Sequence, residues 1–195
     1  MKMDKPFVIS VNSVSGGGKT TLSTLLHKSL PDSSLFCFDD FDDTNIYPVD
    51  FYQWSRRGGD IEEFDCPGMQ AAVAAEVHRG AARWIILDFP FGRRHSRFCD
   101  TIDLAVFVDT PLDVAMARRI LRDYTINPDE SSEETLNRLH NDMSNYLARG
   151  HYPYLSTYKD KDHSDLVLDG RRSLDDLKND VITMLKSRNL VTHVF

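Results

Sequence analysis

A run of three glycines between an apolar segment and a helical pattern constrains this chain more than any other feature. Residues 13–21 read Ser-Val-Ser-Gly-Gly-Gly-Lys-Thr-Thr, and the apolar segment Phe7–Val11 precedes them. Consecutive glycines let the backbone curl so that several N–H groups point into one concavity, where phosphate oxygens fit. A strand, a glycine loop and then a helix form the context of a phosphate-binding loop. The segment therefore predicts a site for a nucleoside triphosphate with magnesium, and a glycine-rich turn that binds nothing is the alternative.

Each position of this loop has an expected role. Lys19 is expected to reach the β- and γ-phosphates, and the hydroxyl of Thr20 to complete a magnesium shell. The full pattern has glycine at its first position, where this chain has Ser13, so the serine must either avoid positive φ or bear strain. The expected nucleotide-binding residues of the loop are Ser15, Gly16, Gly17, Gly18, Lys19, Thr20 and Thr21.

The bulk composition limits the class of protein. A length of 195 residues, with 41% hydrophobic and 27% charged residues, predicts one globular domain over 1–195. A net charge of −7 argues against nucleic-acid or membrane-surface partners. The three cysteines have no CxxC spacing and no secretory signal precedes them, which favours reduced thiols in the cytoplasm. A homo-oligomer is left open.

Short apolar runs alternate with helical patterns along the chain. The runs do not alternate polar with apolar residues, so both faces of their sheet are expected to be buried, as in a parallel sheet covered by helices. We expect a three-layer α/β fold with five parallel strands, and ligands at the carboxyl ends of the strands. The expected strands are Phe7–Val11, Leu35–Phe38, Trp84–Leu87, Leu104–Val108 and Leu166–Leu168. The expected helices are Lys19–Leu30, Gly68–Arg79, Leu112–Asp123, Glu133–Ala148 and Leu174–Ser187.

Acidic residues follow the second expected strand. Asp39 and Asp40 come first, and Asp42 and Asp43 follow Phe41. In phosphoryl transfer to an alcohol, one carboxylate can accept the hydroxyl proton while another orients the acceptor. Asp39 is our candidate for the base because it lies nearest the strand, with Asp40 beside it on the acceptor; a solvated acidic turn is the alternative.

Two further strands end in an aspartate that could face magnesium, Asp88 and Asp109. Asp109 precedes Thr110 and Pro111, so a helix-capping role would explain it. No helix follows Asp88 directly, and we therefore favour Asp88 as the metal-side carboxylate.

Arginines cluster on the fourth expected helix. Arg118 and Arg122 share a face at i, i+4 spacing, with Arg119 alongside. Guanidinium groups suit the charge that spreads over a transferring phosphoryl group, and a lid that carries them would exclude water. A basic, exposed helix face paired with acids is the alternative. We expect a lid at about 118–132.

Aromatic residues lie in the irregular region at about 40–67, which we expect to be an acceptor-binding insert. Tyr52 and Trp54 could stack on a flat base, or they could belong to the core. The segment His151–Tyr154 has no chemistry that its sequence assigns.

With these residues in place, the chain resembles the uridine kinase and nicotinamide riboside kinase group of P-loop small-molecule kinases. The resemblance rests on residues 15–22, on Phe38–Phe41 and on Asp109-Thr110 followed by residues 117–123. It implies MgATP as donor, Asp39 as base, and Arg118, Arg119 and Arg122 as lid arginines. Asp88-Phe89 departs from the Glu-Gly that the group usually has.

The sequence thus predicts a kinase that transfers the γ-phosphoryl group of ATP to a hydroxyl of a small metabolite, a nucleoside or riboside. Lys19, Asp39, Arg118 and Arg122 are the expected catalytic residues, and Arg119 is expected on ATP. The competing hypothesis is a nucleotide-gated regulatory module or ATPase without a small-molecule acceptor, in which Asp39 and the arginines would be incidental.

Overall fold

The computed structural model describes residues 5–124, 131–188 and 190 of the chain. Five strands form one sheet in the order β2-β3-β1-β4-β5, and every neighbouring pair is parallel. This confirms the expected three-layer α/β fold of a P-loop NTPase. The strands are β1 (Phe7–Asn12), β2 (Ser33–Cys37), β3 (Trp84–Asp88), β4 (Leu104–Asp109) and β5 (Leu166–Asp169).

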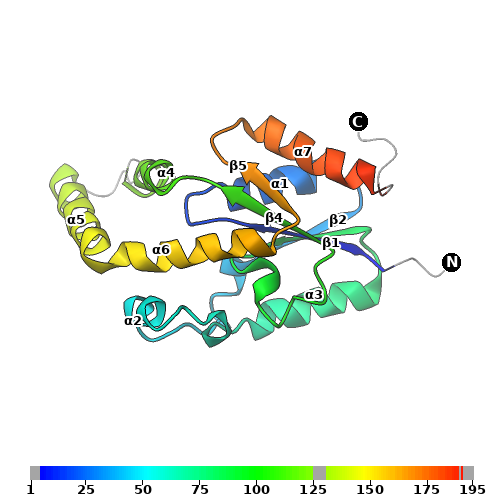
Figure 1. The fold of residues 1–195 in the computed structure, drawn as a ribbon, viewed down its shortest axis with the longest axis horizontal. Coiled ribbons are helices and arrows are strands. Elements are labelled where there is room, and N and C mark those ends of the chain that lie inside the picture. Colours follow the sequence, from blue (N-terminus) through cyan, green and yellow to red (C-terminus); the bar gives the residue numbers. More distant parts are fainter. Residues whose placement is uncertain (1–4, 125–130, 189, 191–195) are drawn as a thin grey trace.

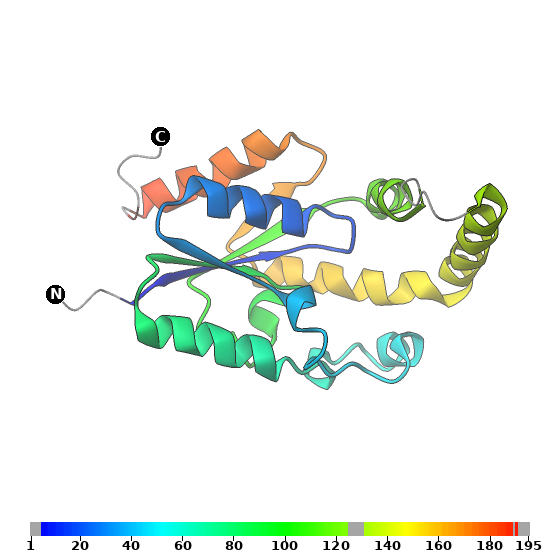
Figure 2. The same ribbon diagram turned by 180° about the vertical axis from the view of Figure 1, so that it is seen from behind.

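Helices cover both faces of the sheet (Figures 1 and 2). Helices α1 (Lys19–Ser29) and α7 (Leu174–Ser187) lie on one face, and α3 (Pro67–Arg79) lies on the other. Short helix α2 (Phe51–Arg56) lies beyond α3, at the end of the molecule where the strands point their carboxyl ends. No helix within the described ranges is long and apolar enough to cross a membrane.

Residues of the central strands alternate between two separate cores. In β3, Ile85 and Leu87 pack with the side chains of α3, whereas Trp84 and Ile86 pack with those of α1 and α7. Both sets are buried to 2% exposure or less. Because apolar residues are needed on both faces, the strands show no period-two alternation in the sequence.

The helices near the carboxyl ends of β4 and β5 differ in part from the expected pattern. Helix α4 covers Leu112–Tyr124, and α5 covers Ser132–Asn145 with Ser131 as its capping residue. The helix expected over Glu133–Ala148 gives way to a π-helical turn at Tyr146–Gly150, and the chain continues as α6 (His151–Thr157). The sequence did not predict α6, because it contains Pro153. That proline lies in the first turn of the new helix, where a missing N–H costs little.

Candidate functional site

The glycine loop joins β1 to α1, as the sequence predicts. Gly16 and Gly18 have φ of 80° and 102°, a left-handed conformation that favours glycine. A Cβ added at Gly16 would overlap the carbonyl oxygen of Ala115, so α4 packs directly against the loop at a point where only glycine fits. Backbone N–H groups of the loop and of the start of α1 make a place suited to phosphate.

Ser13 enters this loop without strain. Among the described residues, Asp32 is the only non-glycine residue with positive φ, so Ser13 avoids that region. Its buried hydroxyl donates a hydrogen bond to the carbonyl oxygen of Val108 at 2.7 Å. A Cβ added at Gly17 would overlap this same hydroxyl. The serine therefore anchors the loop to β4 and requires a glycine four residues later.

Lys19, the first residue of α1, contacts the carboxylate of Asp88 at the end of β3. Asp88 is 1% exposed and pairs in register with Val11 and Cys37 on the two flanking strands. Burial, followed by the charge of Asp88, raises the pKa of Cys37 to about 11, so this thiol stays protonated. Asp109 lies elsewhere and pairs with Lys161 at 2.5 Å.

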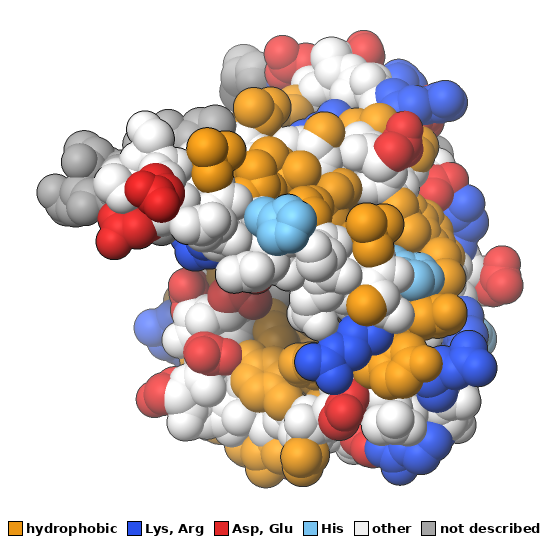
Figure 3. Space-filling view, turned by 90° about the vertical axis from the view of Figure 1, so that its left-hand side faces the viewer, with side chains coloured by type: hydrophobic (Ala, Val, Ile, Leu, Met, Phe, Trp, Pro, Cys, Tyr) orange, Lys and Arg blue, Asp and Glu red, His pale blue; other side chains and the backbone are white. Residues whose placement is uncertain are grey.

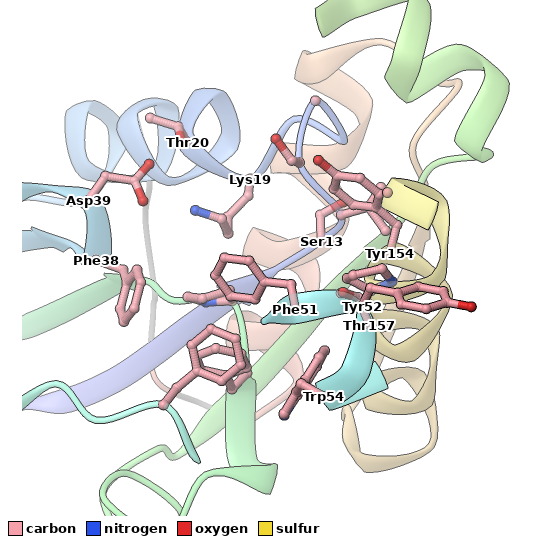
Figure 4. A pocket seen from close by; sticks show the side chains of 18 of the residues that line it. Ser13, Lys19, Thr20, Phe38, Asp39, Phe51, Tyr52, Trp54, Tyr154 and Thr157 are labelled. Carbon is pink, nitrogen blue, oxygen red and sulfur yellow. The ribbon is translucent and has the colours of Figure 1, made fainter. Parts of the chain in front are cut away.

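A cavity of about 760 Å³ opens beside the loop. Figure 3 shows it as a hollow with hydrophobic side chains inside and charged side chains around it. One wall comes from the loop and α1, and the opposite walls come from the insert and from α4, α5 and α6 (Figure 4). The residues of the loop and α1 that line it are Ser13, Val14, Ser15, Gly16, Gly18, Lys19, Thr20 and Thr21.

Asp39 lies at the wall of this cavity. It follows β2 in a 3-10 turn, Phe38–Phe41, and its side chain is exposed. In Figure 4 the Asp39 carboxylate and the Lys19 amine point toward one another from two elements. Asp40 is exposed too, but it is not among the described residues that line the cavity. Asp39, the candidate base, and Lys19, the cation expected to bind phosphate, therefore line the same cavity.

The three arginines expected in the lid have different surroundings. Arg122 lines the cavity; its hydrogen bond to Asp123 and, more weakly, the charge of Asp39 raise its pKa. The Arg118 guanidinium donates to the carbonyl oxygen of Gly170 at 3.0 Å. Arg119 and Arg118 are not among the described residues that line the cavity. Their roles on phosphate stay predictions, and residues 125–130 of the expected lid lie outside the described residues.

Arg119 instead connects α4 to α6. Its guanidinium donates to the hydroxyl of Tyr154 and lies over the same ring, 5.3 Å from the centroid. The Cγ atom of Arg119 is also close to the loop, since a Cβ added at Gly16 would overlap it.

The aromatic residues of the insert serve both as core and as cavity wall. Trp54 is 4% exposed, donates from its indole N–H to the carbonyl oxygen of Asp60 at 2.6 Å, and lines the cavity. Tyr52 also lines the cavity and packs edge to face on Tyr152 of α6. Trp54 is thus a core residue, the second of the two alternatives that the sequence left open, and it also lines the cavity; its stacking on a base stays a prediction.

Sequence reasoning missed the wall formed by the end of α5 and the segment after it. Asn145, Arg149, Gly150, Pro153, Tyr154 and Thr157 line the cavity from this side. The signal that could have found them is the density of tyrosines after Asn145, at positions 146, 152, 154 and 158. Three of these tyrosines, at 152, 154 and 158, lie outside any predicted helix or strand. Aromatic rings at that density require a surface on which to pack.

Comparisons with known proteins support the fold. No protein-family model and no curated protein sequence matches the chain. An uncharacterized protein from Eubacterium ventriosum is 13% identical with a TM-score of 0.51, over 93% of this chain and 99% of that one. A protein of Thermus thermophilus is 18% identical with a TM-score of 0.45, over 94% and 98%. A deoxyadenosine kinase from M. mycoides, with bound dCTP, is 12% identical with a TM-score of 0.48, over 93% and 100%.

At sequence identities this low, the comparisons inform the fold and not the function. The likeness to the Eubacterium protein shows that the two chains share a fold. Together with the glycine loop between β1 and α1, the strand order defines a P-loop, kinase-like fold.

Proposed function

We propose that the chain is a kinase that transfers the γ-phosphoryl group of ATP to a hydroxyl of a small metabolite, a nucleoside or riboside. The observation that carries this proposal is one cavity with Lys19 and Thr20 on one wall and Asp39 on another. Phosphoryl transfer to an alcohol requires a cation that binds the phosphates and a carboxylate that can accept the hydroxyl proton, on two sides of the same cavity. The resemblance of residues 15–22 and Phe38–Phe41 to the uridine kinase and nicotinamide riboside kinase group points to the same reaction.

The donor side suits ATP. Gly16 and Gly18, both with positive φ, shape a loop that suits phosphate oxygens, and Lys19 offers its ammonium beside that loop. Thr20 and Asp88 are the residues that would hold magnesium, whose charge offsets that of the phosphates when it is bound. Asp88 contacts Lys19, so cation and metal-side acid are neighbours.

On the acceptor side, Asp39 would hold the acceptor hydroxyl and take its proton as the acceptor oxygen bonds to the γ-phosphorus. The bond between that phosphorus and the β,γ-bridging oxygen would break in the same step, and ADP would leave. Arg122, which lies on the cavity wall, would face the charge on the transferring group. In this proposal the insert at about 40–67 holds the acceptor with Tyr52 and Trp54, Asp40 contributes to it, and the segment at about 118–132 closes over the site. The domain is one unit over 1–195.

The size and lining of the cavity favour this function over a regulatory module without an acceptor. A nucleotide-gated module needs the loop but no acceptor pocket, whereas here seven aromatic residues line the cavity that contains Lys19. These residues are Phe38, Phe51, Tyr52, Trp54, Phe64, Phe91 and Tyr154.

A thermal-shift panel of nucleosides, ribosides, sugars and vitamins, with a non-hydrolysable MgATP analogue present, tests the proposal. A true acceptor at a hundred times its Kd should add about 2.7 kcal/mol to the free energy of unfolding. The compound that gives a shift should then support ADP formation that needs magnesium. Lys19→Ala should remove the shift caused by the nucleotide alone. A panel with no shift beyond that of the nucleotide would favour the regulatory module.

A further inference from the structure

Two polar connections join the cavity wall on α6 to the phosphate-binding loop. Both start from the 3-10 helix η5 (Tyr158–His163), which continues directly from α6. Tyr154 and Thr157 of α6 line the cavity, and the residues that make the connections, Tyr158 and Asp160, follow them.

The first connection runs through Thr110. The hydroxyl of Tyr158 donates to the carbonyl oxygen of Thr110 at 2.5 Å. The hydroxyl of Thr110, which is fully buried, donates to the carbonyl oxygen of Gly17 at 2.8 Å. A cavity-side helix is therefore two hydrogen bonds away from a backbone carbonyl of the glycine loop.

The second connection runs through Asn12, the residue directly before the loop. Its amide group donates to one carboxylate oxygen of Asp160 at 2.8 Å, and the other oxygen pairs with Arg94 at 2.5 Å. Asn12 and Asp160 are 2% and 3% exposed. A buried carboxylate is held in place only where its partners are fixed, so Asp160 sets the position of η5 relative to the start of the loop.

We propose that Tyr158 and Asp160 are positioning residues that couple nucleotide binding at the glycine loop to the order of the acceptor wall on α6. Neither residue lines the cavity, so neither is expected to touch a substrate. Phosphate binding orders the backbone at Gly17, and the Thr110 connection passes that restraint to Tyr158 and to the cavity-lining residues before it. This inference rests on the proposed function, since it assigns α6 to the acceptor.

Coupling of this kind would favour an ordered mechanism in which ATP binds before the acceptor. Once the nucleotide has ordered the wall, the acceptor hydroxyl is held in a fixed geometry relative to Asp39 and the donor phosphate. Such fixed positioning of the reacting groups lowers the barrier to the transfer. The same order would leave the wall less defined when no nucleotide is bound, so an acceptor alone would bind more weakly.

Hydrogen–deuterium exchange with the full chain tests the coupling without knowledge of the acceptor. The probe is the magnesium complex of adenosine 5′-(β,γ-imido)triphosphate. In the wild type, this nucleotide should slow exchange both in residues 13–21 and in residues 146–157, the latter by at least about fivefold. Tyr158→Phe removes one hydroxyl and keeps the ring, so it should preserve the slowing in 13–21 and lose most of it in 146–157.

Two further variants separate coupling from loss of structure. Asp160→Asn should act as Tyr158→Phe does. It also leaves the half-buried Arg94 beside a neutral side chain, so Tyr158→Phe is the primary variant. Asp165→Asn is the matched control, since it removes the ion pair of Asp165 with Arg93, at 2.7 Å. Asp165 accepts a hydrogen bond from the N–H of Ala105 near the start of β4, away from the loop. A merely loosened α6 would exchange faster with and without nucleotide, and the difference between the two states would remain.

The possible results are distinct. If the nucleotide slows exchange nowhere in the wild type, the proposed function fails and the coupling falls with it. If it slows 13–21 but not 146–157, or if Tyr158→Phe keeps the wild-type response in 146–157, the coupling is wrong while the proposed function stands. Loss of the response in Asp165→Asn would also overturn the coupling, because any ion pair would then have the same effect.

Discussion

The ammonium group of Lys19 contacts the carboxylate of Asp88, so the cation expected on phosphate and the acid expected on magnesium are direct neighbours. Lys19 begins α1 and Asp88 ends β3, and the two residues are 69 positions apart in the chain. Asp88 is almost fully buried, and a buried carboxylate needs such a partner. In the proposed reaction, both charges of this pair are redirected toward the triphosphate and its metal.

Asp88→Asn should therefore change the dependence of turnover on magnesium. We expect the magnesium concentration for half-maximal rate to rise about 10- to 100-fold, because an amide serves a metal or its bound water less well than a carboxylate. The measurement is a magnesium titration of steady-state turnover at saturating ATP. Asp109→Asn is the control, since it loses only the pairing with Lys161. A larger effect in Asp109→Asn would reassign the metal-side role to Asp109.

Asp39→Asn should separate chemistry from nucleotide binding. We expect kcat to fall about 10²- to 10⁴-fold, because the amide cannot take the acceptor proton, while the affinity for ATP is unchanged. Turnover and the thermal shift with a non-hydrolysable ATP analogue measure the two quantities. Asp43→Asn, an exposed neighbour in the same acidic run, should behave as the wild type. Near-normal kcat in Asp39→Asn would show that another group, or no group, takes the proton.

Ser13→Gly would restore the usual first residue of the loop, and we expect it to be harmful. The variant loses the buried hydrogen bond to the carbonyl oxygen of Val108 and frees the backbone in the unfolded chain. Together these effects should lower the free energy of unfolding by about 1–3 kcal/mol. Urea unfolding followed by circular dichroism measures it, with Ser13→Ala to isolate the hydroxyl. A variant as stable as the wild type would show that the hydroxyl does not anchor the loop.

Tyr52→Ala should weaken the binding of the acceptor and leave the binding of ATP unchanged. Tyr52 lines the cavity on the insert side and packs on Tyr152, so we expect its ring to form part of the acceptor wall. Loss of an aromatic contact of about 0.5–1.5 kcal/mol corresponds to an increase in acceptor KM of about 2- to 12-fold. Tyr52→Phe keeps the ring and should retain most of the affinity. An increase in the KM for ATP instead would place the nucleotide, not the acceptor, against this ring.

Local patterns predicted the parts of this molecule that local physics determines. The sheet follows from uninterrupted apolar runs such as Trp84–Leu87, and the loop from glycines next to Lys19. The tyrosines after Asn145 indicate a packed surface, but helix α6 itself could not be predicted in this way, because its first turn contains Pro153. The position of η5, which continues α6, depends on contacts more than 100 residues away in the chain, such as the one between Asp160 and Asn12. The environments of the arginines could not be predicted either. Their spacing on one helix does not indicate that Arg118 donates a hydrogen bond to the carbonyl oxygen of Gly170.

The pairing of Arg93 with Asp165 should make stability depend on pH in acid. Burial alone would raise the pKa of Asp165, but the hydrogen bonds from Arg93 and from the N–H of Ala105 outweigh it and hold the pKa below 3.8. A carboxyl with a lowered pKa in the folded state stabilises that state above its unfolded pKa, and the contribution is lost as the pH falls through the lowered value. Asp165→Asn should therefore be less stable than the wild type near pH 7, and this difference should shrink as the pH falls below 3.8. Urea midpoints of both proteins across this range measure the effect, and a difference that stays constant with pH would contradict the assignment.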